Sequence, residues 1–398
     1  MTIKRFEYQD SGRRWTLEST EFGGFNLLVG LSGAGKTSVL ESLREVRRMG
    51  LSRPGLRRPG GERSWCIELQ AEPDCTYRWE ARIATVDANP GSAALLVEDK
   101  RIELAAEEPV RFLSERIQEC NGNVIVERGP EGFLFAGNKL PKLSDTESAI
   151  SLLKHEDRIA PIHRALERVL FSAAESTQIV VLDPSYRERL DTAPFATVDA
   201  LRENTELAVF IKAYVALRSH PDAFERIRQK YIDIFGSVTD LTVDRMVALD
   251  PVEAKRALLF SHDVITVAIK ERGSDDWIVG PYISSGMRRT FFHLTELEFA
   301  PRGTTIVIDE YENSMGVNCL PAVTDLFLQR QDELQFILTS HHPYVIDNVP
   351  LDWWRVVTRK GGVVTVRPAR EIPELDTRSQ QDRFTLLANS SVFEQGIQ

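Results

Sequence analysis

The chain has 398 residues, 42% hydrophobic and 27% charged, which is typical of a folded globular protein with a sizeable core. Its formal net charge of -10 excludes a surface that attracts nucleic acid or anionic membranes everywhere, so such a contact needs a local basic stretch. A membrane partner is not expected, because the sequence contains neither an apolar run of about 20 residues nor a signal-peptide pattern. We expect a cytoplasmic protein. Its scattered cysteines are predicted to be reduced thiols: Cys66, Cys75, Cys120 and Cys319.

A glycine-rich turn follows the first strong apolar run, residues 25–30, and precedes apolar residues at helical spacing from Lys36 onward. The turn fits GxxxxGK[ST], and its strand–loop–helix context is the one that a P-loop requires. A chance glycine-rich turn is the alternative, and this context disfavours it. The predicted cofactor-binding residues here are Gly30, Leu31, Ser32, Gly33, Ala34, Gly35, Lys36, Thr37 and Ser38.

A P-loop predicts ATP as the ligand and Mg²⁺ as its ion. Its glycines allow successive backbone N–H groups to point at phosphate oxygens, next to the positive end of a helix dipole. Lys36 is expected to reach the β- and γ-phosphates and to contribute to catalysis. The hydroxyl of Thr37 is expected to bind Mg²⁺.

Short β-type runs separated by turn signals follow between residues 64 and 140, after a loop at 49–63. They predict an antiparallel meander, so residues 1–145 form the N-terminal ATPase lobe. From 146 to 260 the pattern is mostly helical, for example at 159–171 and 197–217, and predicts an inserted helical lid.

Strand character returns in the last segment, residues 261–398, which is predicted to be the C-terminal ATPase lobe. Its strands are expected at 264–269, 305–309 and 334–339, followed by a hairpin near 354–366. Apolar runs without alternation favour a buried, largely parallel sheet. The fold class is therefore α/β: a mixed central sheet with flanking helices, an antiparallel meander and a lid.

An apolar strand that ends in Asp309 and Glu310 is the second candidate element of the site. Asp309 is expected to complete the Mg²⁺ shell through water, and Glu310 to act as the general base on the attacking water. Acidic residues after a strand are common, so this pair indicates an ATPase site only in combination with the P-loop. About 270 residues separate the two motifs, too many for one βαβ crossover, which again indicates an inserted module.

Two further marks flank the acidic strand. Ser284, Ser285 and Gly286 precede a helix, and His341 and His342 follow the next strand. A plain helix N-cap is an equally good explanation of the serines, and a core histidine remains open for His341. The pair of histidines alone makes a poor metal site.

In this order, the P-loop, the segment YISSGMRRTFFHLTEL, the strand IVIDEYENSMG and ILTSHHPYVIDNVP resemble an ABC-type ATPase head of the RecF/SMC/OLD-like branch. This resemblance implies that Ser284, Ser285 and Gly286 close over ATP held by a second subunit, and that His341 senses the γ-phosphate. It therefore implies at least a homodimer. Ile283 and Tyr311 replace the leucine and the proline that many such heads carry.

OLD-like proteins often carry a Toprim nuclease, but only about 50 residues follow His341, and the tail from Arg378 to Gln398 contains too few acids for a metal cluster. The first hypothesis is therefore a regulatory ATPase that controls a separately encoded effector, such as a Toprim or HNH nuclease, in anti-phage defence. The alternative is a RecF-like DNA-repair ATPase. Its DNA contact could use the basic stretch of Arg44, Arg47, Arg48, Arg53, Arg57, Arg58 and Arg63, for which a solvated loop is the competing interpretation.

Overall fold

The structure is a computed structural model in which the chain divides into two compact units, each with its own hydrophobic core. Unit 1 comprises Met1–Phe171, Gly303–Tyr311 and Gln335–Gln398, and unit 2 comprises Ser172–Arg302 and Glu312–Leu334. The residues described are 2–53, 61–72, 75–85, 94–97, 100–103, 110–172, 179–182, 184–192, 195–205, 207–250, 264–316, 318–375, 383–390 and 396–397.

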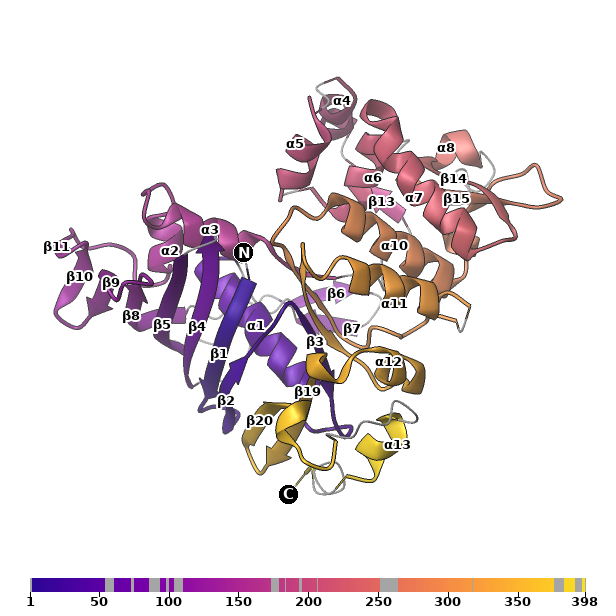
Figure 1. The fold of residues 1–398 in the computed structure, drawn as a ribbon. Coiled ribbons are helices and arrows are strands. Elements are labelled where there is room, and N and C mark those ends of the chain that lie inside the picture. Colours follow the sequence, from indigo (N-terminus) through magenta and orange to yellow (C-terminus); the bar gives the residue numbers. More distant parts are fainter. Residues whose placement is uncertain are drawn as a thin grey trace. The chain divides into compact units, whose positions relative to one another are not determined.

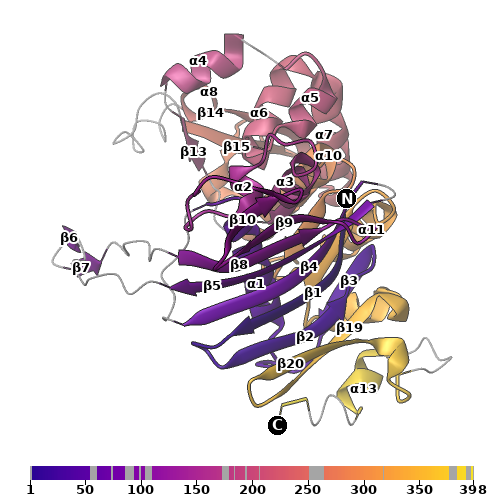
Figure 2. The ribbon, with the colours of Figure 1, turned by 90° about the vertical axis from the view of Figure 1, so that its left-hand side faces the viewer.

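Unit 1 is built around one large mixed sheet (Figures 1 and 2). Its strands are β1 (Thr2–Asp10), β2 (Trp15–Glu21), β3 (Phe25–Val29), β4 (Glu62–Glu72), β5 (Cys75–Thr85), β8 (Val110–Gln118), β9 (Val124–Gly129), β10 (Gly132–Phe135), β11 (Asn138–Lys139), β12 (Val169–Phe171), β17 (Thr305–Ile308), β18 (Gln335–Thr339), β19 (Trp354–Lys360) and β20 (Val363–Pro368). A separate hairpin pairs β6 (Ala94–Val97) with β7 (Lys100–Glu103). The helices are α1 (Lys36–Gly50), α2 (Ala149–Leu152), α3 (Ala160–Glu167), α12 (Pro343–Asn348) and α13 (Arg383–Ala388).

The strand order is β11-β10-β9-β8-β5-β4-β1-β2-β20-β19-β3-β18-β17-β12. The segment from β19 to β12 is parallel, and all residues of β3, β17 and β18 are buried, as expected for strands covered on both faces. The segment from β2 to β11 is antiparallel and contains the predicted meander. The predicted α/β class with a mixed central sheet is confirmed.

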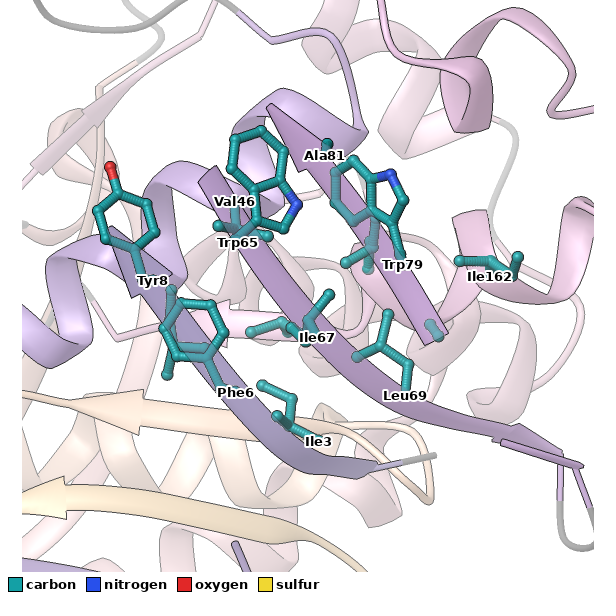
Figure 3. Packing of buried hydrophobic residues seen from close by; sticks show 14 of the residues in the cluster. Ile3, Phe6, Tyr8, Val46, Trp65, Ile67, Leu69, Trp79, Ala81 and Ile162 are labelled. Carbon is teal, nitrogen blue, oxygen red and sulfur yellow. The ribbon is translucent and has the colours of Figure 1, made fainter. Parts of the chain in front are cut away.

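Alternation along the meander strands creates the core of unit 1. Trp65 and Trp79, on neighbouring strands, are buried with their rings edge to face and 5.2 Å between centroids (Figure 3). Val46 of α1 and Ile162 of α3 belong to the same cluster. The meander therefore packs against the helix that follows the P-loop.

A buried polar network sits beside these tryptophans. The carboxylate of Glu115 accepts hydrogen bonds from Nε1 of Trp79 (3.0 Å) and the backbone N of Ala149 (2.8 Å), and it pairs with Arg128 (3.3 Å). Burial raises the pKa of Glu115 to about 7, although the Ala149 amide and the Arg128 guanidinium oppose the shift. The carboxylate thus anchors the first turn of α2.

This raised pKa predicts a pH-dependent stability. Between the ordinary value of 4.5 and about 7 the folded state binds more protons than the unfolded state, so stability falls as pH rises through this window. We expect wild type to lose about 3 kcal/mol relative to Glu115→Gln between about pH 5 and pH 8. Urea unfolding of both proteins across this range measures the difference. A difference that does not change with pH would contradict the prediction.

Unit 2 combines helices with a small antiparallel sheet (Figure 1). Its strands are β13 (Ile179–Val181), β14 (Val238–Arg245), β15 (Val264–Glu271) and β16 (Ile278–Val279). Its helices are α4 (Pro184–Thr192), α5 (Val198–Glu203), α6 (Val209–Ser219), α7 (Pro221–Ile234), α8 (Met246–Leu249), α10 (Ser285–Phe299) and α11 (Leu320–Gln329). Among the helices that the structure describes, none has the length and apolar character needed to cross a membrane.

The apolar run at 264–269 was expected in the parallel sheet, and this expectation is wrong. It forms part of β15, which pairs antiparallel with β13, β14 and β16 in unit 2. The first six residues of β15 are buried, so its lack of alternation reflects burial on both faces and says nothing about the direction of neighbouring strands.

Two predicted helices are shorter in the structure. The segment 159–171 ends its helix at Glu167, and Val169–Phe171 instead pair with β17 as β12. The segment 197–217 is divided into α5 and α6, because Oδ1 of Asn204 accepts the backbone N–H of Leu207 in a local turn. Unit 2 also differs from the predicted lid at 146–260, since it begins at Ser172 and contains a sheet.

Candidate functional site

The P-loop connects β3 to α1 as the sequence predicts. Gly30, Gly33 and Gly35 all have positive φ angles, of 152°, 87° and 103°. A Cβ on Gly30 would lie 2.4 Å from the carbonyl oxygen of Val357, and one on Gly35 would lie 2.9 Å from Cγ2 of Val364. Backbone conformation and the close approach of β19 and β20 therefore both require glycine here.

The N-terminus of α1 suits an anion. The helix has 15 residues, and its described first turn has neither a side-chain cap nor an acidic residue. The N–H groups at a helix N-terminus and the helix dipole together favour negative charge. In the turn itself, Ser32, Gly33 and Thr37 are exposed, whereas Leu31 and Ser38 are half-buried and Ala34 is buried.

The side chain of Lys36 folds over the loop that precedes it. Its Nζ donates hydrogen bonds to the carbonyl oxygens of Gly30 (2.8 Å) and Leu31 (2.9 Å). The residue is only 5% exposed. A buried ammonium group is costly unless it is hydrogen-bonded, so these carbonyls hold the charge within the loop.

The acidic pair follows β17, whose neighbour β18 lies next to β3. The hydroxyl of Thr339, at the end of β18, donates to Oδ1 of Asp309 (2.5 Å) and accepts from the backbone N of Glu310 (2.7 Å). The backbone N of Tyr311 donates to the carbonyl oxygen of Thr339 (3.0 Å). One threonine thus fixes the turn that carries both acids.

Glu310 itself is an exposed residue with a φ of 45°. Non-glycine residues adopt this left-handed conformation rarely and at some cost, and they are concentrated at functional sites. The hydrogen bond of its N–H to Thr339 helps to maintain the conformation.

The two histidines after β18 have different environments. Nδ1 of His342 accepts the backbone N–H of Tyr344 (3.2 Å) and caps α12, so this residue has a structural role. His341 is exposed at the end of the strand. The alternative of a histidine satisfied in the core does not apply to His341.

Parallel strands bring these elements to one edge of the sheet. Leu28 pairs with Thr339, and Leu338 pairs with Ile308, so the P-loop, His341 and the acidic pair all follow the carboxyl ends of adjacent strands. With about 4.8 Å between strands, the end of β17 lies about 10 Å from the end of β3. Ligands of open α/β sheets bind at such carboxyl edges.

The oxygen donors at this edge suit Mg²⁺. The predicted ligands are the exposed hydroxyl of Thr37 and the carboxylate of Asp309, which is hydrogen-bonded to Thr339. Hydroxyl and carboxylate oxygens are hard ligands of the kind that Mg²⁺ prefers. The glycine cradle of the P-loop fits the phosphates of a nucleotide in the same way.

The predicted signature residues lie in unit 2, at the start of α10. Oγ of Ser284 accepts the backbone N of Met287 (3.3 Å), so this serine does cap the helix. A Cβ on Gly286 would lie 2.6 Å from the carbonyl oxygen of Ser314, which shows that residues 314–316 press against the helix start. Ser284 and Ser285 are exposed there.

Sequence reasoning did not assign three residues that the structure places beside the site. Thr339 is hydrogen-bonded to Asp309 and to the backbone N of Glu310, and its only signal in the sequence was its position at a strand end, two residues before His341. Trp15, whose Nε1 would lie 3.9 Å from a Cβ on Gly35, and Val357 border the P-loop. Phe6 and Tyr8 of β1 are buried in the core of unit 1 (Figure 3).

Two arginines of the basic stretch make internal contacts, whereas Arg53 is exposed. Arg63, which is 4% exposed, pairs with Glu45 at 2.5 Å. Nε of Arg47 donates to the carbonyl oxygen of Leu166 (3.0 Å). Arg44 pairs with Glu41 at 2.5 Å. Arg57 and Arg58 lie outside the described residues.

Removal of the Thr339 hydroxyl should affect hydrolysis more than ATP binding. Thr339→Val keeps the shape but leaves Oδ1 of Asp309 and the N–H of Glu310 without this partner. We expect the steady-state ATPase rate to fall about tenfold. Thr365→Val is the matched control, since its hydroxyl also donates to a carboxylate, that of Glu18 (3.1 Å). Equal rates in both variants would contradict a positioning role for Thr339.

The solved structures that are similar to this chain include three that each cover 92% of its length. They are the Smc head bound to the C-terminal winged-helix domain of ScpA (14% identity, 98% of that chain, TM-score 0.47), the Smc head with an extended coiled coil bound to the C-terminal domain of ScpA derived from Pyrococcus furiosus (12%, 95%, 0.49) and the SMC head domain from Thermotoga maritima (12%, 99%, 0.40). No curated protein matches the chain.

The sequence also matches a protein family over residues 144–347, just over half of the 398-residue chain. The matched segment begins before α2 and ends within α12, so it contains Ser284, Asp309, Glu310 and His341. The chain therefore belongs to the family described as "AAA domain, putative AbiEii toxin, Type IV TA system", and it is an ATPase of the AAA type.

Proposed function

We propose that this ATPase binds ATP with Mg²⁺ at the carboxyl edge of the parallel strands and hydrolyses it slowly to control an assembly. The observation that carries the proposal is the convergence of the P-loop, Asp309–Glu310 and His341 on the ends of β3, β17 and β18. Phosphate-binding and water-activating groups on adjacent strands are what nucleotide hydrolysis requires.

Each residue of this edge has a proposed part in the reaction. Lys36 and the N–H groups of the P-loop bind the phosphates, and Mg²⁺, when held by Thr37 and through water by Asp309, offsets their charge. Glu310 takes a proton from a water molecule, whose oxygen forms a bond to the γ-phosphorus while the bond to the β–γ bridging oxygen breaks. The products are ADP and phosphate. His341 orients the water and senses the γ-phosphate.

The second half of each site comes, in this proposal, from another copy of the chain. Ser284, Ser285 and Gly286 stand at the start of α10, a helix of 15 residues whose first turn has no acidic residue. Such a helix end favours anions. The exposure of the two serines leaves this end available to the γ-phosphate of ATP bound by a partner copy.

The assembly would control a separate effector, and a Toprim or HNH nuclease in anti-phage defence is the effector that we propose. The family description contains the words "putative AbiEii toxin, Type IV TA system". This description supports the proposal that the chain acts together with a second gene product. ATP-dependent closure would favour one state of that complex, and hydrolysis would release it.

Self-association with and without nucleotide tests the proposal directly. We expect the native mass of the full chain to be at least twice as large with ATP and Mg²⁺ as without nucleotide. Addition of ADP in place of ATP should leave the smaller species dominant. A chain that binds ATP but keeps the same mass would contradict the two-copy site.

A RecF-like DNA-binding ATPase remains the second candidate. It needs a cationic surface, and the internal contacts of Arg47 and Arg63 argue against the predicted stretch as that surface. DNA binding measured at several salt concentrations separates the two functions. Tight binding that weakens steeply as salt rises would favour the DNA-binding function over the effector-only function.

A further inference from the structure

Two cysteines that are far apart in the sequence meet at one end of the meander. Cys75 is the first residue of β5, and Cys120 lies in the turn between β8 and β9 (Figure 2 shows these strands side by side). Their Sγ atoms are 3.2 Å apart across a sequence separation of 45 residues. All four cysteines are free thiols in the structure, as predicted, but these two lie in contact with each other.

The backbone around the pair is well ordered by hydrogen bonds. β5 and β8 are paired from Thr85↔Val110 to Arg78↔Gln118, and Cys75 and Cys120 lie three and two residues beyond the last of these pairs. The turn is closed by the bond from the N of Gly122 to the carbonyl oxygen of Glu119 (2.8 Å). The pairing of β5 with β8 therefore brings the two cysteines to the same end of the meander.

The carboxylate of Glu119 fixes the turn from a second direction. It pairs with Arg158, just before α3, at 2.9 Å. A disulfide bond requires about 2 Å between sulfurs, so closure needs a movement of only about 1 Å. Rotation of the two side chains can supply this without a change of strand pairing.

We propose that Cys75 and Cys120 are a redox-reactive pair that a small-molecule disulfide converts into an intrachain disulfide bond. The thiolate of one cysteine attacks the small disulfide, forms a mixed disulfide and releases one thiolate. The second cysteine then attacks the protein sulfur of the mixed disulfide and releases the other thiol. The protein loses two electrons and two protons, and the small disulfide gains both as it becomes two thiols.

Exposure sets the order of the two attacks. Cys120 is exposed, whereas Cys75 is half-buried. Burial, followed by the hydrogen bond with Cys120, raises the pKa of Cys75, which keeps it protonated longer. Cys120 is therefore the first nucleophile, and Cys75 resolves the mixed disulfide.

The other two cysteines do not share these properties. Cys66 is buried in the sheet, where burial raises the pKa of its thiol to about 12. Cys319 is 1% exposed in unit 2. Both should stay reduced, so the chain contains its own internal controls.

Oxidation of the full chain with oxidised glutathione tests the proposal. We expect the loss of two thiols and, after proteolysis without reductant, one peptide pair that links Cys75 to Cys120. The new cross-link should raise the melting temperature of the oxidised protein by about 5 °C, because it constrains the unfolded chain. Dithiothreitol should reverse both changes.

The variant Cys120→Ser is the matched control, with no internal cross-link and no shift of the melting temperature under the same treatment. Three outcomes would overturn the proposal: four thiols that remain reduced, a mixed disulfide with glutathione that persists on Cys120, or cross-links only between separate chains. None of these readouts depends on ATP hydrolysis.

Discussion

Glu310→Gln should bind ATP as wild type does but turn it over at least about 100-fold more slowly, because an amide cannot accept the proton of the attacking water. Glutamine has the size of glutamate and the same tolerance for a φ of 45°, so the turn held by Thr339 should persist. If hydrolysis opens the assembly, the variant should also accumulate as an ATP-bound dimer. Single-turnover hydrolysis and native mass measure the two effects.

The matched control is Glu131→Gln, an exposed glutamate in the turn between β9 and β10. It should change neither rate nor mass. A Glu310→Gln protein that still hydrolyses ATP at the wild-type rate would refute the base assignment. Slow hydrolysis without dimer formation would instead support Glu310 as the general base and refute the two-copy site.

Motifs made of consecutive residues could be predicted from the sequence. Residues 30–37 contain both the glycines and the lysine of the P-loop, and a strand and a helix flank them directly. Steric contact with Val357 and Val364 explains the glycines afterwards, but the conformational requirement was already visible in the pattern. The same holds for Asp309 and Glu310 at the end of an apolar strand.

Side-chain contacts between strands could not be predicted in this way. The role of Thr339 depends on β18 lying beside β17 in a register that places its hydroxyl between Asp309 and the N–H of Glu310. Residues 310 and 339 are 29 apart, and local propensity carries no information on their pairing. The proximity of Cys75 and Cys120 is a second example, since it follows from β5 and β8 being neighbours.

Burial patterns also had a limit. An apolar run predicts that both faces of a strand are covered, but it does not distinguish the large sheet of unit 1 from the small sheet of unit 2. β15 and β17 have similar patterns and belong to different sheets. The two strands contribute to different hydrophobic cores, β17 to that of unit 1 and β15 to that of unit 2.

Lys36→Ala should lower the affinity for ATP at least about 100-fold, corresponding to the loss of about 3 kcal/mol of charged hydrogen bonds to the phosphates. The substitution also removes the bonds to the carbonyl oxygens of Gly30 and Leu31, so the loop could change shape. Lys36→Met addresses this, because it keeps an unbranched apolar stem in the buried position and removes only the charge. Binding of a fluorescent ATP analogue, at equal protein stability, measures both variants.

The positive charge of Lys36 accounts for the loss of ATP affinity only if two conditions are met. Both variants should lose affinity to a similar extent, and Lys142→Ala, which removes an exposed lysine after β11, should retain it. Retained affinity in Lys36→Met would show that the helix end and the glycine cradle suffice for the phosphates. Since a nucleotide must bind before two copies can close around it, loss of affinity should abolish ATP-dependent self-association as well. A Lys36→Met protein that has lost affinity for ATP at the P-loop and still dimerises when ATP is added would therefore separate assembly from the P-loop and refute the proposed site.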